Sequence, residues 1–236
     1  MLILKPEVCA NTIIDLGCGY GRSTLEILKA CENVYSIGID VECNKLINNV
    51  VGKTEYRVDF ICCNSIALPI RDSAVNSITS ILTIHELPTD SITSVLNEVN
   101  RVLIKGGYFL VIDKVKVKVE NPSGELPLLT ELAYHKAREY ALGIKSLGVL
   151  TPKELIRLVV NAGFKLIKQG VLKRGKWLSG AGFLKCWEKE TLKLINMISD
   201  EEKKAELMRL VNRIKEAALR YGYGPVNIIV ALFKKP

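Results

Sequence analysis

The feature that most constrains the fold is a glycine-rich segment near the N-terminus, IIDLGCGYGRST at residues 13–24. An apolar pair and an acid run into glycines at alternate positions, Gly17, Gly19 and Gly21, and an amphipathic segment follows at once. Glycine tolerates a positive φ and lets a ligand approach the backbone. Free N–H groups at the start of the following helix point into the same turn. The segment therefore predicts a buried strand, a ligand-binding turn and a helix.

The spacing of these glycines narrows the class of ligand. A dinucleotide fingerprint, G-x-G-x-x-G, needs a glycine where this chain has Arg22, and no Gly-Lys-Ser/Thr of a P-loop follows. The D-x-G-x-G-x-G pattern instead resembles the first motif of class I S-adenosylmethionine-dependent methyltransferases, in particular those with a methyltransferase type 11-like domain. The resemblance implies S-adenosylmethionine as the cofactor. It assigns cofactor binding to Asp15, Gly17, Cys18, Gly19 and Gly21.

A second strand pattern, NVYSIGID, ends at Asp40, about twenty residues after the glycines. In nucleotide-binding α/β folds an acid at the tip of the second strand accepts hydrogen bonds from ribose hydroxyls. A carboxylate suits this role because its two oxygens can accept from both hydroxyls of a vicinal diol. We therefore expect Asp40, with the adjoining Val41, in the cofactor site.

The run before the fourth strand resembles that of the same family, with two acids replaced by amides. Where the family has Asp-Ala and Phe-Asp, this chain has Asn64-Ser65 and Val75-Asn76. Asn64 can still accept from an adenine amino group through its carbonyl oxygen, without charge assistance. The resemblance thus implies adenine binding at Asn64 and Ser65, and Ile81 at the end of the fourth strand completes the expected cofactor site.

Alternation of strand and helix patterns favours an α/β fold. The prediction is a Rossmann-like, seven-stranded, mostly parallel sheet with helices on both faces, plus helical insertions, in one domain spanning residues 1–236. The length and 48% apolar content suffice for such a core. Strands are expected near 11–16, 34–40, 56–63, 75–82, 107–115, 164–173 and 226–233. Helices are expected near 22–31, 43–50, 90–103, 126–144, 152–162 and 184–220, the last broken near Ser199–Asp200.

Two helical insertions depart from a minimal methyltransferase, one at 114–150 after the fifth strand and one at 184–220 between the sixth and seventh. Family members usually have a helix or two before the first strand, and only about ten residues precede it here. The cover is therefore expected from elsewhere in the chain. Either insertion could cover the acceptor site or form the contact of a homodimer.

Candidate catalytic residues follow the fourth strand, whose tip faces the ligand crevice in open α/β sheets. Methyl transfer from a sulfonium depends on in-line positioning. A neutral hydroxyl acceptor also needs a base, and histidine is the side chain best matched to neutral pH. His85 is therefore the candidate base, the alternative being a structural histidine at a strand end, and Glu86 adjoins it. Tyr134 and His135 in the first insertion are candidates to line the acceptor pocket.

Charge is distributed unevenly along the chain. Residues 1–113 carry a net charge of −4, residues 114–172 carry +5 and residues 173–236 carry +7. A basic substrate side attracts anionic ligands, although a lysine-rich surface is also common in heat-adapted proteins. The segment TIHELP after the fourth strand differs from the Asn/Asp-Pro-Pro-Tyr/Phe motif of RNA amino-group methyltransferases. The expected acceptor is a small, polar or anionic molecule. The alternatives are an RNA or protein acceptor on the basic half, and a non-catalytic binder.

Seven cysteines are present, none in a C-x-x-C pair. Reduced, mostly buried thiols are expected rather than disulfides or a metal site, so no metal is predicted. No apolar run approaches the roughly 18 residues of a membrane span, and the N-terminus lacks the layout of a signal peptide. The sequence therefore predicts a cytoplasmic protein without a membrane partner.

Overall fold

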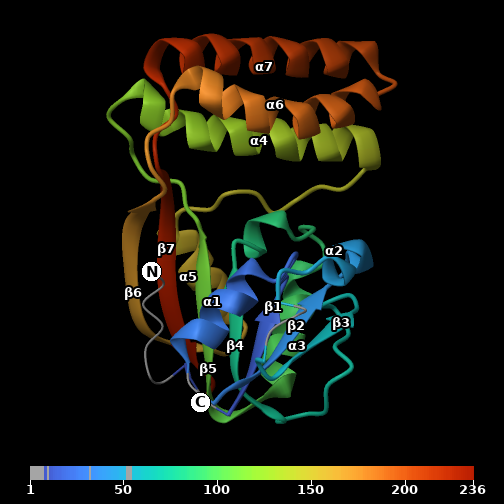
Figure 1. The fold of residues 1–236 in the computed structure, drawn as a ribbon, viewed down its shortest axis with the longest axis vertical. Helices are drawn as coiled ribbons and strands as arrows, with labels where there is room; N and C mark the ends of the chain where they lie inside the picture. Colours follow the sequence, from blue (N-terminus) through green and yellow to red (C-terminus); the bar gives the residue numbers. More distant parts are fainter. Residues whose placement is uncertain (1–7, 10, 32, 52–54) are drawn as a thin grey trace.

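The computed structural model describes residues 8–9, 11–31, 33–51 and 55–236. The strands are β1 (Thr12–Leu16), β2 (Tyr35–Asp40), β3 (Val58–Cys62), β4 (Val75–Ile81), β5 (Leu103–Lys114), β6 (Lys165–Arg174) and β7 (Val226–Lys234). Over the described residues they form a seven-stranded sheet in the order β3-β2-β1-β4-β5-β7-β6 (Figure 1). Strands β1 to β5 are parallel, whereas β7 pairs antiparallel with β5 and with β6. The predicted Rossmann-like, mostly parallel sheet is confirmed.

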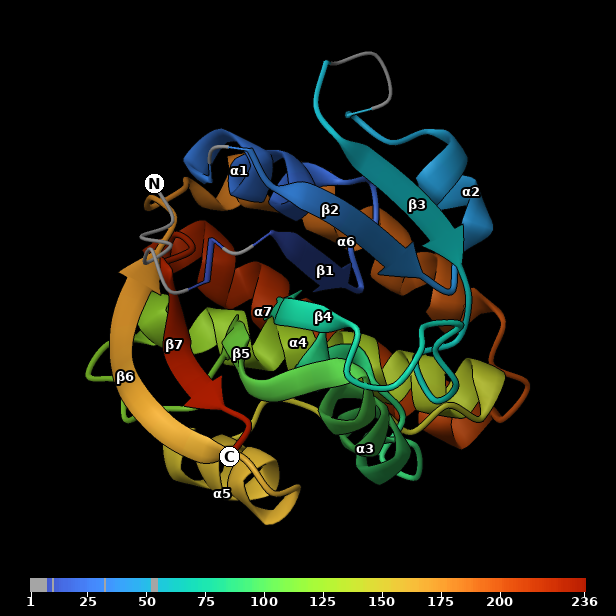
Figure 2. The same cartoon turned by 90° about the horizontal axis from the view of Figure 1, so that it is seen from below.

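Helices lie on both faces of this sheet. The helical elements are α1 (Arg22–Ala30), α2 (Cys43–Ile47), the 3-10 turn η1 (Ile84–Glu86), α3 (Ile92–Val102), α4 (Pro122–Leu142), α5 (Pro152–Asn161), α6 (Gly180–Asn196) and α7 (Glu201–Tyr221). Helix α1 covers one face, and α3 and α5 cover the other (Figure 2). Side chains that alternate along β1 divide between the two cores: Ile13 packs with Ile27 of α1, and Ile14 with Val99 of α3. This is the burial on both faces expected of a mostly parallel sheet.

Local signals in the sequence set several helix ends. Thr151 accepts from the backbone of Glu154, whose carboxylate accepts from the backbone of Thr151, so a capping box begins α5. Helix α6 ends at Asn196, and Asp200 caps α7 by accepting from two backbone N–H groups. The predicted break of the last helical stretch is thus confirmed.

Helix α4 begins earlier than predicted. Asn121 caps it by accepting from the backbone N–H of Gly124 at 2.8 Å. Pro127 lies inside the helix, where it offers no N–H to the carbonyl of Ser123. The N–H of Gly224 donates to that carbonyl instead, at 2.9 Å. A segment distant in sequence therefore compensates for the proline and allows the longer helix.

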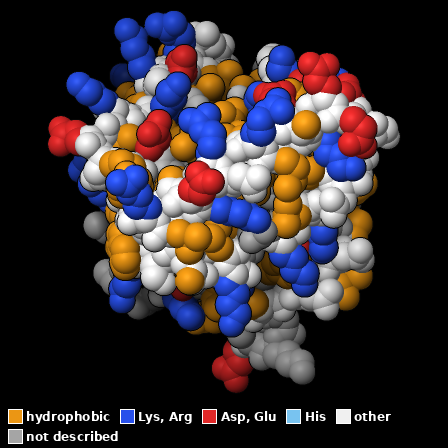
Figure 3. Space-filling view, turned by 90° about the horizontal axis from the view of Figure 1, so that it is seen from above, with side chains coloured by type: hydrophobic (Ala, Val, Ile, Leu, Met, Phe, Trp, Pro, Cys, Tyr) orange, Lys and Arg blue, Asp and Glu red, His pale blue; other side chains and the backbone are white. Residues whose placement is uncertain are grey.

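Helices α4, α6 and α7 form a layer beyond the carboxyl ends of the parallel strands, at the top of Figure 1. The layer has apolar clusters of its own, one around Phe183 and Ile214 and another around Ile195 and Val211. Both predicted helical insertions contribute to it. Its outer face carries lysine and arginine side chains interspersed with apolar and acidic ones (Figure 3).

Two disulfides correct the expectation of reduced cysteines. Cys9 bonds to Cys31 with a Cα–Cα distance of 5.1 Å, and Cys43 bonds to Cys62 at 5.2 Å. Each pair joins elements that the fold brings side by side, and such proximity is not visible in the spacing of cysteines along a chain. Among the helices of the described chain, none has the length and apolar character needed to cross a membrane.

Candidate functional site

The glycine turn between β1 and α1 has the backbone that its sequence predicts. Gly17, Gly19 and Gly21 have φ values of +72°, +54° and +77°. The turn is held at its start, because the N–H groups of Gly17 and Cys18 donate to the carbonyl of Ile39 at 2.8 and 3.0 Å. A Cβ at Gly19 would meet no atom within 4 Å, so its backbone is open to a ligand.

Asp15 holds the end of this turn in place through hydrogen bonds to the residues that follow it. Its side chain is fully buried, and it accepts hydrogen bonds from the hydroxyls of Ser23 and Thr24 at 2.7 Å each and of Thr79 at 3.1 Å. Burial raises the pKa of Asp15 above its usual value, while these hydroxyls oppose the rise. We therefore revise the expectation that Asp15 binds the cofactor directly, and assign it the positioning of the turn.

The tips of β2 and β3 bring the other expected cofactor residues to the same edge. The carboxylate of Asp40 accepts from the N–H of Gly19 at 2.8 Å, which ties the second strand to the glycine turn. Val41 follows with 64% of its surface exposed. Asp40 pairs with Cys62 in the parallel register, so the exposed Asn64 and the half-buried Ser65 lie just beyond that strand end.

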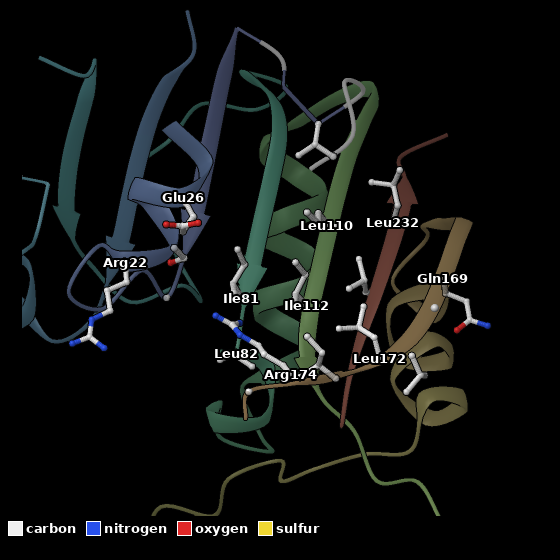
Figure 4. A pocket seen from close by; sticks show the side chains of 18 of the residues that line it. Arg22, Glu26, Ile81, Leu82, Leu110, Ile112, Gln169, Leu172, Arg174 and Leu232 are labelled. Atoms are coloured by element: carbon white, nitrogen blue, oxygen red, sulfur yellow. The ribbon is translucent and has the colours of Figure 1, made fainter. Parts of the chain in front are cut away.

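A cleft of about 1250 Å³ runs from the glycine turn along the α1 side of β4, β5, β7 and β6 (Figure 4). Its wall is mainly apolar, and Arg22 and Glu26 of α1 and Arg174 of β6 add charged groups. Three of the expected cofactor residues, Gly17, Cys18 and Ile81, line it. The cleft therefore connects the predicted cofactor turn with an uncovered part of the sheet face.

The predicted catalytic residue lies in a second group at the tip of β4. His85 is 3% exposed, and its Nδ1 lies 2.5 Å from Oδ1 of Asp113 at the end of β5. Oδ2 of Asp113 accepts from the backbone N–H of His85 at 3.0 Å. The Nε2 atoms of His85 and His135 face the carboxylates of Glu86 and Glu131. We call His85, Glu86, Glu131 and His135 the β4-tip cluster.

Neighbouring charges strongly shift the pKa values of His85 and Glu131 in this cluster. Burial disfavours a charged His85, but the negative charge of Asp113 and the hydrogen bond with it prevail and raise the pKa of His85 to about 9. Burial likewise opposes ionisation of Glu131, but His85 and Lys114 lower the pKa of Glu131 to about 2. Lys114 Nζ lies 2.6 Å from Glu131 Oε1, and Arg138 Nη1 lies 2.7 Å from Glu86 Oε2. The surroundings of His85 therefore favour a positive charge on its imidazole.

Both acceptor-pocket candidates lie on α4, with different surroundings. His135 joins the cluster, its ring centroid 5.8 Å from that of His85. Tyr134 is half-buried beside it, with the guanidinium of Arg138 over its ring at 5.9 Å. Sequence reasoning did not identify Glu131, although Glu131 and His135 are four residues apart and share a helix face.

Comparison with known proteins agrees with this architecture. Residues 14–111 match a family model described as a methyltransferase domain. A human relative, probable tRNA methyltransferase 9B, is 28% identical over 109 residues, covering 46% of this chain and 22% of the relative, so the match spans about a fifth of that protein.

Solved structures share the fold over nearly the whole chain. An S-adenosylmethionine-dependent methyltransferase from Methanosarcina mazei superposes with a TM-score of 0.62 and 17% identity, covering 99% of both chains. Geranyl diphosphate methyltransferase in complex with S-adenosylmethionine gives a TM-score of 0.58 and 14% identity, covering 99% of this chain and 81% of that one. The glycine turn, the strand order and the matched domain are thus in agreement: residues 14–111 match a methyltransferase domain, and the chain has the fold of S-adenosylmethionine-dependent methyltransferases.

Proposed function

We propose that the protein transfers a methyl group from S-adenosylmethionine to a small, polar or anionic acceptor held between the tip of β4 and helix α4. One observation carries this proposal. The glycine turn and the β4-tip cluster lie at one edge of the sheet, and the layer of α4, α6 and α7 lies over that edge (Figure 1). Thr83, two residues before His85, donates to the carbonyl of Gly17 at 3.2 Å, which links the two parts.

The proposed roles follow from position. Gly19 leaves the backbone open to the cofactor, and Gly21 allows the turn its positive φ before α1. Asp40 accepts from the ribose hydroxyls, and Asn64 with its neighbour Ser65 contacts the adenine. Gly17, Cys18, Val41 and Ile81 complete the proposed cofactor site. The cofactor supplies an electrophilic methyl on sulfur, and the protein holds the acceptor atom in line with it.

Proton removal depends on the acceptor. If the acceptor is a hydroxyl, His85 is the candidate base, with Tyr134 and His135 beside it. Helix α4 would then cover the acceptor, in agreement with a compact ligand. The name of geranyl diphosphate methyltransferase, a structural neighbour, likewise indicates a small anionic acceptor for that protein.

Turnover to S-adenosylhomocysteine with fractions of a cell extract tests the proposal. The purified chain is incubated with S-adenosylmethionine and with fractions separated by size, each with and without nuclease treatment. We expect the low-molecular-weight fraction to support turnover regardless of nuclease. Cofactor binding without turnover in any fraction would instead indicate a non-catalytic binder, and binding of NAD in its place would contradict the cofactor assignment.

An RNA acceptor is the second candidate, since the human relative is named a tRNA methyltransferase and the segments after residue 113 are basic. The basic side chains on the outer face of the helical layer are interspersed with apolar and acidic ones rather than gathered in one stripe (Figure 3). This distribution gives less support to a surface that binds along the phosphate backbone of an RNA. Turnover that only an RNA fraction supports, and that nuclease abolishes, would establish this alternative.

A further inference from the structure

The β4-tip cluster has a feature that methyl transfer does not require. Four potential ligand atoms, one each from His85, Glu86, Glu131 and His135, all lie within 4.8 Å of one another. His85 Nε2 lies 3.5 Å from Glu86 Oε1 and 3.5 Å from Glu131 Oε2. His135 Nε2 lies 3.8 and 4.0 Å from the same two oxygens. Four side chains from two separate elements, η1 and α4, thus converge on one point.

These separations match the geometry of a shared cation better than that of direct hydrogen bonds. Side-chain hydrogen bonds between nitrogen and oxygen rarely exceed about 3.2 Å. Two ligands bound to one ion at about 2.1 Å with tetrahedral angles lie about 3.4 Å apart. The observed nitrogen–oxygen distances of 3.5 to 4.0 Å are therefore slightly wider than those of a filled site, as expected before an ion contracts it.

Both imidazoles also leave a buried nitrogen without a hydrogen bond. Nε2 of His85 and Nε2 of His135 are enclosed and make no hydrogen bond, although the two residues are only 3% and 8% exposed. Buried polar atoms are nearly always satisfied, so two such atoms directed at one point indicate a missing ligand. The chain contains two histidines in all, and both are in this cluster.

Surrounding residues orient each ligand as in known metal sites. Asp113 binds Nδ1 of His85 and so directs Nε2 at the cluster, where a bound ion would take the place of the Nε2 proton. Lys114 binds one oxygen of Glu131 and leaves the other facing the cluster, and Arg138 does the same for Glu86. The two carboxylates thus present one oxygen each, and two nearby cations limit the net negative charge of the empty site.

We propose that His85, Glu86, Glu131 and His135 form a binding site for a divalent transition-metal ion. Two imidazoles with two carboxylates suit Zn²⁺, Mn²⁺, Fe²⁺ or Co²⁺, whereas Mg²⁺ and Ca²⁺ prefer oxygen ligands alone. The sequence predicted no metal because its ligands come in two pairs more than forty residues apart. The i, i+4 pair Glu131 and His135 is the signal that points to the site in hindsight.

The location gives such an ion a role that rests on the proposed function. Glu86 keeps 35% of its side chain exposed, so one side of the cluster reaches solvent. An ion there that takes a fifth ligand on this side would bind an oxygen atom of the acceptor and lower the pKa of a bound hydroxyl. Metal binding itself does not depend on this role and is tested separately.

The test is to treat the tag-free protein with a chelator and then titrate it with Co²⁺. The visible absorption of the bound ion reports binding. We expect binding of one equivalent, displacement by Zn²⁺ and none by Mg²⁺. Glu131→Gln and His135→Gln should each weaken Co²⁺ binding by about 100-fold or more, since changes in outer-shell residues alone cost about 10- to 100-fold. Glu125→Gln, an exposed acid on the same helix, is the matched control and should bind as wild type does.

A second measurement on the wild-type protein guards against variants that fail to fold. Nitrogen-15 NMR of the imidazoles reports on both histidines of the chain, and Zn²⁺ should shift the Nε2 resonances of both together. Unchanged resonances, or Co²⁺ binding that survives both substitutions, would overturn the proposal. The cluster would then be a buried histidine–carboxylate network that holds protons in place of a metal.

Discussion

Replacing Gly19 with alanine should weaken cofactor binding more than its cost in stability would suggest, and Gly143 provides a matched control. Both glycines have a positive φ, +54° and +70°, and at both a Cβ would meet no atom within 4 Å. Alanine in the left-handed region costs about 1–2 kcal/mol at either position. For a chain of this length that corresponds to a fall in Tm of about 2–8 °C.

Only Gly19 lies where we place the cofactor, because its N–H donates to Asp40, whereas Gly143 ends α4. A methyl group on Gly19 would occupy the open space above the turn. We therefore expect Gly19→Ala to weaken S-adenosylmethionine binding at least about tenfold, equivalent to about 1.4 kcal/mol. Gly143→Ala should leave that affinity unchanged. Isothermal titration calorimetry measures the affinities and thermal unfolding the stabilities.

Gly17 differs from Gly19 and Gly143, because the side chain of Thr83 already occupies the space that a Cβ at Gly17 would need. A Cβ there would lie 2.2 Å from Cγ2 and 2.9 Å from Cβ of Thr83, so a change of rotamer at Thr83 would not relieve the clash. Overpacking adds about 1–3 kcal/mol to the backbone cost, and Gly17→Ala should lose about 2–5 kcal/mol in total. Equal stability of Gly17→Ala and Gly19→Ala, or wild-type affinity in Gly19→Ala, would refute this account of the turn.

Three further predictions concern the same edge of the sheet. Asp40→Ala should lower cofactor affinity about tenfold or more in calorimetry, because charge-assisted hydrogen bonds to the ribose contribute about 1.5–3 kcal/mol each. An unchanged affinity would show that the ribose does not bind at Asp40. The double variant Cys43→Ser, Cys62→Ser should lose about 3 kcal/mol in denaturant unfolding, since that disulfide spans 19 residues; equal midpoints for wild type and variant would contradict this. Burial raises the pKa of Asp15 in the folded state, so its contribution to stability is present below its unfolded pKa and is lost as pH rises through the folded pKa. The free energy of unfolding of wild type relative to Asp15→Asn should therefore fall with rising pH over that range, and a flat difference would indicate an ordinary pKa.

Local patterns were sufficient to predict the elements of this fold. The apolar pair and acid of β1, the capping box of α5 and the break before Asp200 each depend on neighbours in sequence, and each is present. The start of α4 was missed, because the hydrogen bond that makes Pro127 tolerable comes from Gly224, almost one hundred residues away.

In the site, too, features set by neighbours in sequence were predicted and features set by distant contacts were missed. The backbone of the glycine turn and its link to Asp40 follow from the spacing of a single motif. The Asp113–His85 pair and the approach of Glu131 depend on the register of β4 beside β5 and on the path of α4 across the sheet edge, which are tertiary properties. The disulfides were missed for the same reason, since cysteine spacing carries no information on which elements become neighbours.

A catalytic base and a metal ligand would both use Nε2 of His85, so His85 cannot serve in both roles at once. Substitution of His135 distinguishes the two roles. A base needs the lone pair of His85 Nε2 directed at the acceptor, whereas a metal ligand donates that lone pair to the ion. His135 is needed only in the second case, because a base at His85 is already oriented by Asp113. If His85 is the base, His85→Gln should lower turnover about 100- to 10,000-fold and His135→Gln far less, with cofactor affinity unchanged in both. If the cluster binds a metal that acts in the reaction, the two substitutions should lower turnover to a similar extent, and chelation of the wild type should do the same until Zn²⁺ or Mn²⁺ is restored.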